Sequence, residues 1–208
     1  MTQRQVFPAI SLTAEGLACG RGDMVLAGGI AFALGAGQGM LLRGPNGAGK
    51  STLLLTLAGL LPPLAGSVGI SGHDPEAGPP LHHCGHKNGV RARLSVIDTL
   101  QFWAAINGET GLAPQAALEK VGLARAAKLD AGYLSAGQQR RLALARLLVT
   151  RRPLWLLDEP TAALDADGQA LLAGLIGDHL AEGGLAVMAS HDDIAVPGLS
   201  TLVLGGGT

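Results

Sequence analysis

Residues 44–51 have the residue types and spacing of a loop that wraps around phosphate groups. Their sequence, GPNGAGKS, follows a short apolar segment and precedes a leucine-rich segment with helical spacing. Glycines let the backbone approach phosphate oxygens closely, and the N–H groups at the start of the next helix face the anion. We expect Lys50 to reach the terminal phosphates and the Ser51 hydroxyl to bind Mg²⁺. The predicted nucleotide-binding residues are Gly44, Pro45, Asn46, Gly47, Ala48, Gly49, Lys50, Ser51 and Thr52.

Two acids follow a second apolar segment, Leu-Trp-Leu-Leu at 154–157. Asp158 is placed to hold Mg²⁺ through water, together with Ser51. Glu159 lies one residue further and could polarise an attacking water molecule. A strand that simply ends in solvated acids would look the same in isolation, but a phosphate loop earlier in the chain favours the catalytic interpretation.

A third segment, LSAGQQRR at 134–141, predicts a helix that begins at a serine. A serine hydroxyl and glycine amides at a helix N-terminus form an anion site. His191 follows another apolar segment, 185–189, and precedes two aspartates. A capped surface helix and a surface histidine are the simpler interpretations of these two features.

Residues 134–138 resemble the signature of the ABC ATPases, usually L-S-G-G-Q, with Ala136 replacing the first glycine. The resemblance implies that the signature segment of one subunit faces the γ-phosphate of ATP held by another. It also implies that Glu159 and His191 are catalytic, with His191 sensing the γ-phosphate, and that Asp165 lies in a D-loop that contacts the partner subunit. The implied signature residues are Leu134, Ser135, Ala136, Gly137 and Gln138.

The sequence departs from the family pattern at two places. Lys87 occupies the position of the family's Q-loop glutamine, and an ammonium cannot bind Mg²⁺ as an amide oxygen does. Between Thr13 and Ile30 there is no aromatic residue to stack on adenine. Arg21 could stack through its guanidinium plane, or it could be an ordinary surface arginine.

Within this family the chain is similar to the ATP-binding subunit of the cytochrome c maturation haem exporter. The segments that carry this resemblance include GHKNGVR at 85–91, LSAGQQRRLALARL at 134–147 and PLWLLDEPT at 153–161. The resemblance implies ATP and Mg²⁺ as cofactors and a homodimer of this subunit. It also implies an integral membrane transporter subunit as partner, downstream haem-handling proteins, and a peripheral location on the cytoplasmic face of the bacterial inner membrane.

Three other functions remain open. An ABC transporter ATPase for another cargo would have the same site. A soluble ABC protein acting on DNA or the ribosome usually has tandem cassettes or basic linkers. A small phosphoryl-transfer kinase would have no use for the signature segment. The histidines around Cys84 could bind haem or a metal, although a strand leading into the next segment explains them equally well.

Composition narrows these possibilities. A formal net charge of −1 and only 3% aromatic residues disfavour nucleic acid as a partner. The uncharged stretches 24–42 and 52–70 are interrupted by glycines or by Pro62-Pro63, so we expect neither to span a membrane. The N-terminus lacks the pattern of a signal peptide. The two cysteines form no C-x-x-C pair and are expected to be free thiols.

The elements that must position these residues are predicted as follows. Short β segments fill 10–42, and a helix over 50–61 ends at Pro62-Pro63. Together with the resemblance, the pattern predicts an α/β P-loop NTPase core with an N-terminal antiparallel β subdomain and a helical subdomain insertion. We expect a single ABC ATPase domain over 1–208, in which 1–86 and 135–208 form the nucleotide-binding core and about 87–134 the helical subdomain.

Overall fold

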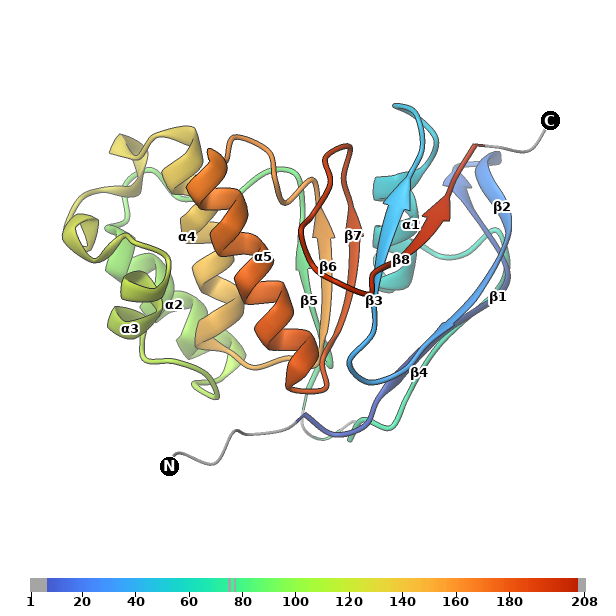
Figure 1. Cartoon of the computed structure of the whole chain (residues 1–208), viewed down its shortest axis with the longest axis horizontal. Coiled ribbons are helices and arrows are strands. Elements are labelled where there is room, and N and C mark those ends of the chain that lie inside the picture. The colour runs from blue at the N-terminus through green and yellow to red at the C-terminus, as the bar shows by residue number, and fades with distance from the viewer. Residues whose placement is uncertain (1–6, 75, 77, 206–208) are drawn as a thin grey trace. The chain divides into compact units, whose positions relative to one another are not determined.

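The computed structural model describes residues 7–74, 76 and 78–205, and it divides the chain into two compact units. The first unit contains both β-sheets, and the second contains most of the helices (Figure 1). The first is built from Met1–Gly85, Pro153–Pro160 and Ala173–Thr208. The second is built from His86–Arg152 and Thr161–Leu172.

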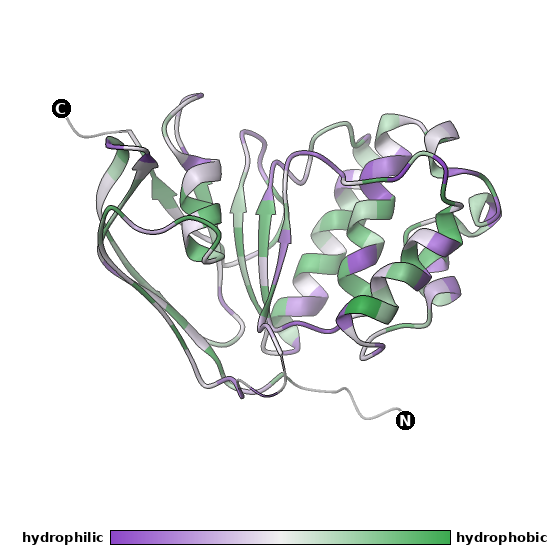
Figure 2. Ribbon diagram, turned by 180° about the vertical axis from the view of Figure 1, so that it is seen from behind, coloured by the Kyte–Doolittle hydropathy of each residue, from purple (hydrophilic) through white to green (hydrophobic). Residues whose placement is uncertain are grey.

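A five-stranded parallel sheet forms the centre of the first unit. Its order is β5-β6-β7-β3-β8, with bounds Leu81–Cys84, Leu154–Asp158, Leu185–Ala189, Gly39–Arg43 and Ser200–Val203. Every residue of β6 and β7 is buried. Strands buried on both faces read as continuous apolar runs rather than alternating ones, and the central strands are hydrophobic along their length (Figure 2).

A three-stranded antiparallel sheet, with order β2-β1-β4, completes the β structure of this unit. The bounds of β1, β2 and β4 are Ser11–Arg21, Met24–Leu34 and Ala65–Ser71. The predicted antiparallel subdomain is therefore confirmed, but β1 and β2 are eleven residues long rather than short segments. Irregularities in the register of β1 against β2 let one long strand continue through its glycine at 16.

The helix after the phosphate loop, α1, spans Lys50–Leu57 and is shorter than predicted. The prediction that Pro62-Pro63 ends it was wrong. Gly59 has φ of +71°, and the Leu60 N–H donates to the carbonyl of Leu55 at 2.9 Å. A glycine in the left-handed region stops a helix by allowing this closing hydrogen bond.

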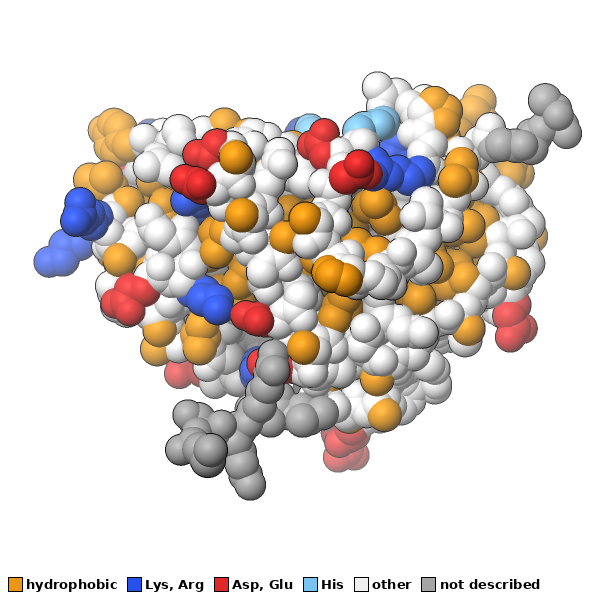
Figure 3. Space-filling view, in the orientation of Figure 1, with side chains coloured by type: hydrophobic (Ala, Val, Ile, Leu, Met, Phe, Trp, Pro, Cys, Tyr) orange, Lys and Arg blue, Asp and Glu red, His pale blue; other side chains and the backbone are white. Residues whose placement is uncertain are grey.

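None of the helices in the described part of the chain is long and apolar enough to cross a membrane. The two uncharged stretches form strands and the short helix α1, as expected. On the face drawn in Figure 3, basic and acidic side chains are interspersed, without a continuous basic stripe. Cys19 and Cys84 are both buried and neither forms a disulfide, and burial raises the pKa of the Cys19 thiol.

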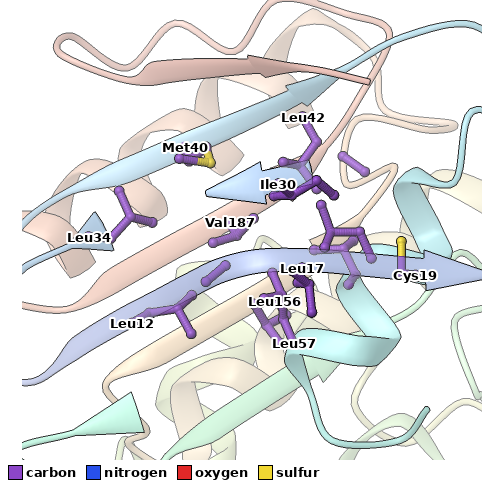
Figure 4. Close-up of a cluster of buried hydrophobic side chains, with 14 of the residues drawn as sticks. Leu12, Leu17, Cys19, Ile30, Leu34, Met40, Leu42, Leu57, Leu156 and Val187 are labelled. Atoms are coloured by element: carbon purple, nitrogen blue, oxygen red, sulfur yellow. The ribbon is translucent and has the colours of Figure 1, made fainter. Parts of the chain in front are cut away.

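The apolar core of the first unit joins its two sheets through α1 (Figure 4). Leu12, Leu17 and Ile30 come from the antiparallel sheet, and Leu42, Leu156 and Val187 come from the parallel sheet; all of them are buried. Leu57 of α1 packs into the same cluster. This shared core fixes α1, and with it the phosphate loop, against the ends of β3 and β6.

The second unit contains α2, α3 and α4, with bounds Val96–Asn107, Pro114–Lys120 and Ala136–Val149, and two 3-10 turns, Ala124–Ala126 and Ala131–Tyr133. Helix α4 packs against α2 and α3. It therefore groups with the helical unit, whereas the predicted boundary assigned residues from 135 onward to the core. The sequence shows that leucines such as Leu142 and Leu144 are apolar, but it does not show which helices or strands bury them.

Helix α5 spans Ala166–Ala181, and its C-terminal end lies in a tightly packed corner of the first unit. His179 stacks on Trp155 with ring centroids 3.9 Å apart and an interplanar angle of 10°. Its Nε2 lies 3.1 Å from the Leu185 carbonyl oxygen. A Cβ at position 184 would lie 2.3 Å from that same Nε2, so only glycine fits there without moving the ring.

Gly184→Ala is therefore expected to lower the free energy of unfolding by about 1–3 kcal/mol, because the new methyl group displaces a buried ring. Urea denaturation followed by circular dichroism measures this. Gly174→Ala is the matched control, since nothing lies within 4 Å of a Cβ there and alanine favours a helix. Equal stabilities of the two variants would contradict the packing argument.

Candidate nucleotide-binding site

The phosphate loop, residues 44–51, connects β3 to α1 at the carboxyl end of the parallel sheet. Ligands of open α/β sheets bind at this edge. Gly44 has φ of +143°, and a Cβ on it would lie 2.4 Å from the Leu204 carbonyl oxygen. Gly49 has φ of +93° and directly precedes the helix. These two glycines let the loop curl so that the amides of the first turn of α1 face outward from its N-terminus.

Lys50 lies inside this loop and is only 8% exposed. Its Nζ donates to the carbonyl oxygens of Gly44 at 2.7 Å and Pro45 at 3.1 Å, and lies 3.3 Å from His191 Nε2. The carbonyl partners that hold this buried ammonium are neutral, so an anion in the loop would compensate its charge more fully. The loop is therefore electrostatically suited to phosphate.

Ser51 and Asp158 meet at the end of β6. The Ser51 hydroxyl donates to Asp158 Oδ1 at 3.0 Å, and Asp158 is 7% exposed. A hydroxyl and a carboxylate are hard oxygen ligands of the kind that Mg²⁺ prefers, and Mg²⁺ takes its remaining ligands from water and substrate phosphates. Within the described residues no group of three or more His, Cys, Asp or Glu side chains could hold a metal by itself. The pair fits an ion that is bound jointly with a phosphate.

Glu159 and His191 lie next to each other at the same edge. Glu159 has φ of +47°, and its N–H donates to the Ala189 carbonyl at 2.8 Å. Its Oε1 lies 3.6 Å from His191 Nε2, which in turn lies 2.8 Å from Asn46 Oδ1. A left-handed backbone on a residue other than glycine is strained and is often found at functional sites. The arrangement aims a carboxylate and an imidazole toward the phosphate loop.

Arg43 is a site residue that sequence reasoning missed. Its guanidinium donates to the Ser190 carbonyl at 3.1 Å, and also contacts the His191 carbonyl and the Asp193 carboxylate. It therefore holds the segment that carries His191 against the end of β3. The sequence feature that could have pointed to Arg43 is a cationic residue at the last position of the strand that precedes the phosphate loop.

The signature segment, residues 134–138, starts α4 in the second unit. Ser135 Oγ accepts from the Gln138 N–H at 3.2 Å, and Gln138 Oε1 accepts from the Ser135 N–H at 2.9 Å. This reciprocal capping box is a strong helix start. Leu134 is buried, whereas Ala136 is exposed, so a methyl group at the first glycine position of the family pattern meets no obstacle. The predicted serine cap is therefore confirmed.

The structure does not bring every predicted residue to one place. Lys87 is exposed in the segment after β5, and its neighbour Asn88 accepts from the buried Arg140 at 3.1 Å. Asp165 belongs to the second unit. Arg21 is exposed at the end of β1. The Q-loop, D-loop and adenine roles of these residues stay predictions.

In the described part of the chain, the histidine and cysteine residues of β5 belong to no group of three or more side chains that could hold a metal ion. His82 and Cys84 are buried, and His83 is half-buried. Burial lowers the pKa of His83, although the nearby Asp158 carboxylate opposes this effect. Both interpretations of these side chains, a haem or metal site and a strand that leads into the next segment, therefore stay predictions.

Comparisons with known proteins show the family to which the chain belongs. A family model described as "ABC transporter" matches residues 27–162. The chain is 48% identical over 199 residues to the cytochrome c biogenesis ATP-binding export protein CcmA of Chelativorans sp. (strain BNC1), covering 94% of this chain and 98% of that protein. It is 47% identical over 205 residues to the protein of the same name from Rhizobium meliloti (strain 1021), covering 94% and 98%.

A solved structure, a putative ABC transporter ATP-binding protein from Pyrococcus furiosus, superposes with a TM-score of 0.81 at 27% identity, covering 93% of this chain and 97% of that one. The parallel sheet, the antiparallel sheet and the helices are therefore those of an ABC ATPase cassette. By its family match, its relatives and its fold, the chain belongs to the ABC transporter family of ATP-binding proteins.

Proposed function

We propose that this chain is the ATP-hydrolysing subunit of an export complex, in which two copies act on an integral membrane subunit. One observation carries the proposal. One edge of a single sheet brings together Lys50, the Ser51–Asp158 pair and the Glu159–His191 pair. A cation, a magnesium-type ligand pair and a general base beside a helix N-terminus are the parts that phosphoryl transfer to water requires.

Each residue has a distinct task in this reaction. Lys50 and the amides of α1 hold the terminal phosphates. Ser51 and Asp158 would hold Mg²⁺, which when bound neutralises charge on the phosphates. Glu159 accepts a proton from the attacking water, and His191 contacts the γ-phosphate from the side of Asn46. Arg43 keeps the His191 segment in register with the loop.

The proposed homodimer rests on a second candidate phosphate-binding segment. The signature segment presents Ser135, Gly137 and Gln138 at the N-terminus of α4, in a different unit from the phosphate loop. We propose that the signature segment of one copy covers the ATP held by the other. ATP binding then closes the dimer, and hydrolysis reopens it.

The cargo and location are proposed from the relatives. Two proteins that match nearly the whole chain are named as ATP-binding export proteins of cytochrome c biogenesis. We propose that this chain powers haem export or delivery to downstream haem-handling proteins, from the cytoplasmic face of the bacterial inner membrane.

Complementation tests this function. In a bacterium that lacks the corresponding gene, the wild-type chain should restore c-type cytochromes detected by haem staining, and the Glu159→Gln variant should not. An affinity-tagged chain should co-purify with an integral membrane protein. Normal c-type cytochromes without the gene, together with co-purification of a transporter for another solute, would show that the cargo is different.

Removing the Asp158 carboxylate tests the magnesium assignment. Asp158→Asn keeps the size and can still accept from Ser51, but loses the negative charge that favours a divalent cation. We expect the Mg²⁺ concentration for half-maximal ATPase activity to rise about tenfold or more, as happens in metal sites that lose a ligand or a residue hydrogen-bonded to a ligand. Asp23→Asn, in the exposed turn between β1 and β2, is the control. An unchanged Mg²⁺ dependence would remove Asp158 from the site.

A further inference from the structure

We propose that Arg141 and Asp165 are a positioning pair that fastens the D-loop segment, residues 161–165, to the signature helix α4. The inference rests on the proposed function, because it concerns the two elements that one copy would present to the nucleotide of its neighbour. The pair makes these two elements one rigid body, so that both reach the neighbour's site together.

One carboxylate oxygen joins two helices. Arg141 Nη2 donates to Asp165 Oδ1 at 2.9 Å, and the Gly168 N–H donates to the same oxygen at 2.8 Å. Arg141 lies on α4, three residues after Gln138, and Gly168 lies in the first turn of α5. Asp165 is therefore both the cap of α5 and the anchor of the signature helix.

A second contact fixes the same two segments where the signature begins. A Cβ at position 137 would lie 2.8 Å from the Ala163 carbonyl oxygen. Ala163 itself has φ of +63°, a left-handed conformation that an alanine adopts at a cost. The signature glycine is thus the point of close approach between α4 and the D-loop segment. With the Arg141–Asp165 pair it gives two contacts, which set both the distance and the angle between them.

The surroundings of Asp165 favour its charged form. The Gly168 N–H, followed by the Arg141 guanidinium, lowers the pKa of Asp165. Any stabilisation from this carboxylate is fully present above its ordinary pKa and is lost as the pH falls through the lowered folded value. Asp165 is exposed, however, with a side chain 72% accessible, and exposed ion pairs contribute little to stability. The pair is therefore better explained by positioning than by stability.

A double-mutant cycle tests the coupling. Arg141→Met removes the charge and keeps an unbranched apolar stem, whereas Asp165→Asn keeps an oxygen for Gly168 and removes the charge for Arg141. Each single variant should lower kcat about tenfold and leave the Kd for a fluorescent ADP analogue within about twofold of wild type, because the loss is in the transition state. The double variant should be no slower than the slower single variant.

Mixed dimers place the effect in the neighbouring site. Dimers of a Lys50→Ala copy with an otherwise wild-type copy keep one intact phosphate loop, which faces the signature of the Lys50→Ala copy. Arg141→Met in the Lys50→Ala copy should abolish most of the remaining ATPase activity. The same change in the copy with the intact loop should leave most of it.

Matched controls are Arg125→Met and Asp167→Asn, exposed residues of the same unit. Thermal melts check folding, and Arg141→Lys, which keeps a charge, should recover part of kcat. Three results would overturn the inference. They are additive losses of kcat in the double-mutant cycle, a nucleotide affinity that falls together with kcat, and equal losses of activity in both mixed dimers. The proposed function has its own test, which does not involve Arg141 or Asp165: it is wrong if Lys50→Ala leaves nucleotide binding intact.

Discussion

Glu159→Gln is expected to reduce steady-state ATP hydrolysis by about two to three orders of magnitude and to leave ATP binding nearly unchanged. Glutamine keeps the shape of the side chain and can still contact His191, which lies 3.6 Å from the carboxylate. It cannot accept a proton from water. The backbone of this residue is held by its N–H, which donates to the Ala189 carbonyl at 2.8 Å whatever the charge of the side chain, so the loss should be confined to chemistry.

The variant should also accumulate a closed dimer in the presence of ATP, since hydrolysis is the step that reopens it. Size-exclusion chromatography with light scattering measures the dimer, and phosphate release measures the turnover. Glu15→Gln, on an exposed position of β1, serves as control and should behave as wild type. A monomeric, fully active Glu159→Gln enzyme would end both the general-base assignment and the dimer model.

Most of the site could be predicted from sequence because its residues stand at the ends of strands or the start of helices. The phosphate loop, Asp158 and His191 each follow an apolar run that forms a buried strand of one parallel sheet. Parallel strands present their carboxyl ends at the same edge, so residues far apart in sequence meet there without further information. Ser135 was predictable for a local reason, since a serine followed by Gln138 three residues later is a helix start.

Other features depend on approaches between segments that no local pattern encodes. Position 137 must be glycine because the Ala163 carbonyl lies close to it. Arg43 matters because its guanidinium donates to the carbonyl of Ser190, which directly follows the neighbouring strand β7. The end of α1 was misjudged because two prolines are a stronger local signal than Gly59, whose positive φ is visible only in the fold. The assignment of α4 to the helical unit depends on which helices cover its leucines, which helical spacing does not reveal.

Lys50→Ala should weaken nucleotide binding by about a hundredfold, because charge-assisted contacts to phosphate contribute roughly 1.5–3 kcal/mol each and Lys50 has no substitute in the loop. A fluorescent ATP analogue titrated into wild type, Lys50→Ala and the exposed control Lys128→Ala measures this. Stability gives an independent test of the role. The Lys50 ammonium is buried, and its hydrogen bonds go to the neutral carbonyls of Gly44 and Pro45.

Without a phosphate, burying the Lys50 ammonium lowers the free energy of unfolding, because neutral carbonyls offset only part of the cost of removing the charge from water. The free energy of unfolding of Lys50→Ala in the absence of nucleotide should therefore equal or exceed that of wild type, although its affinity collapses. Loss of stability together with unchanged affinity would mean that Lys50 merely ties the loop together. A fall in nucleotide affinity without a fall in the free energy of unfolding is the result that a residue kept for an anionic ligand requires.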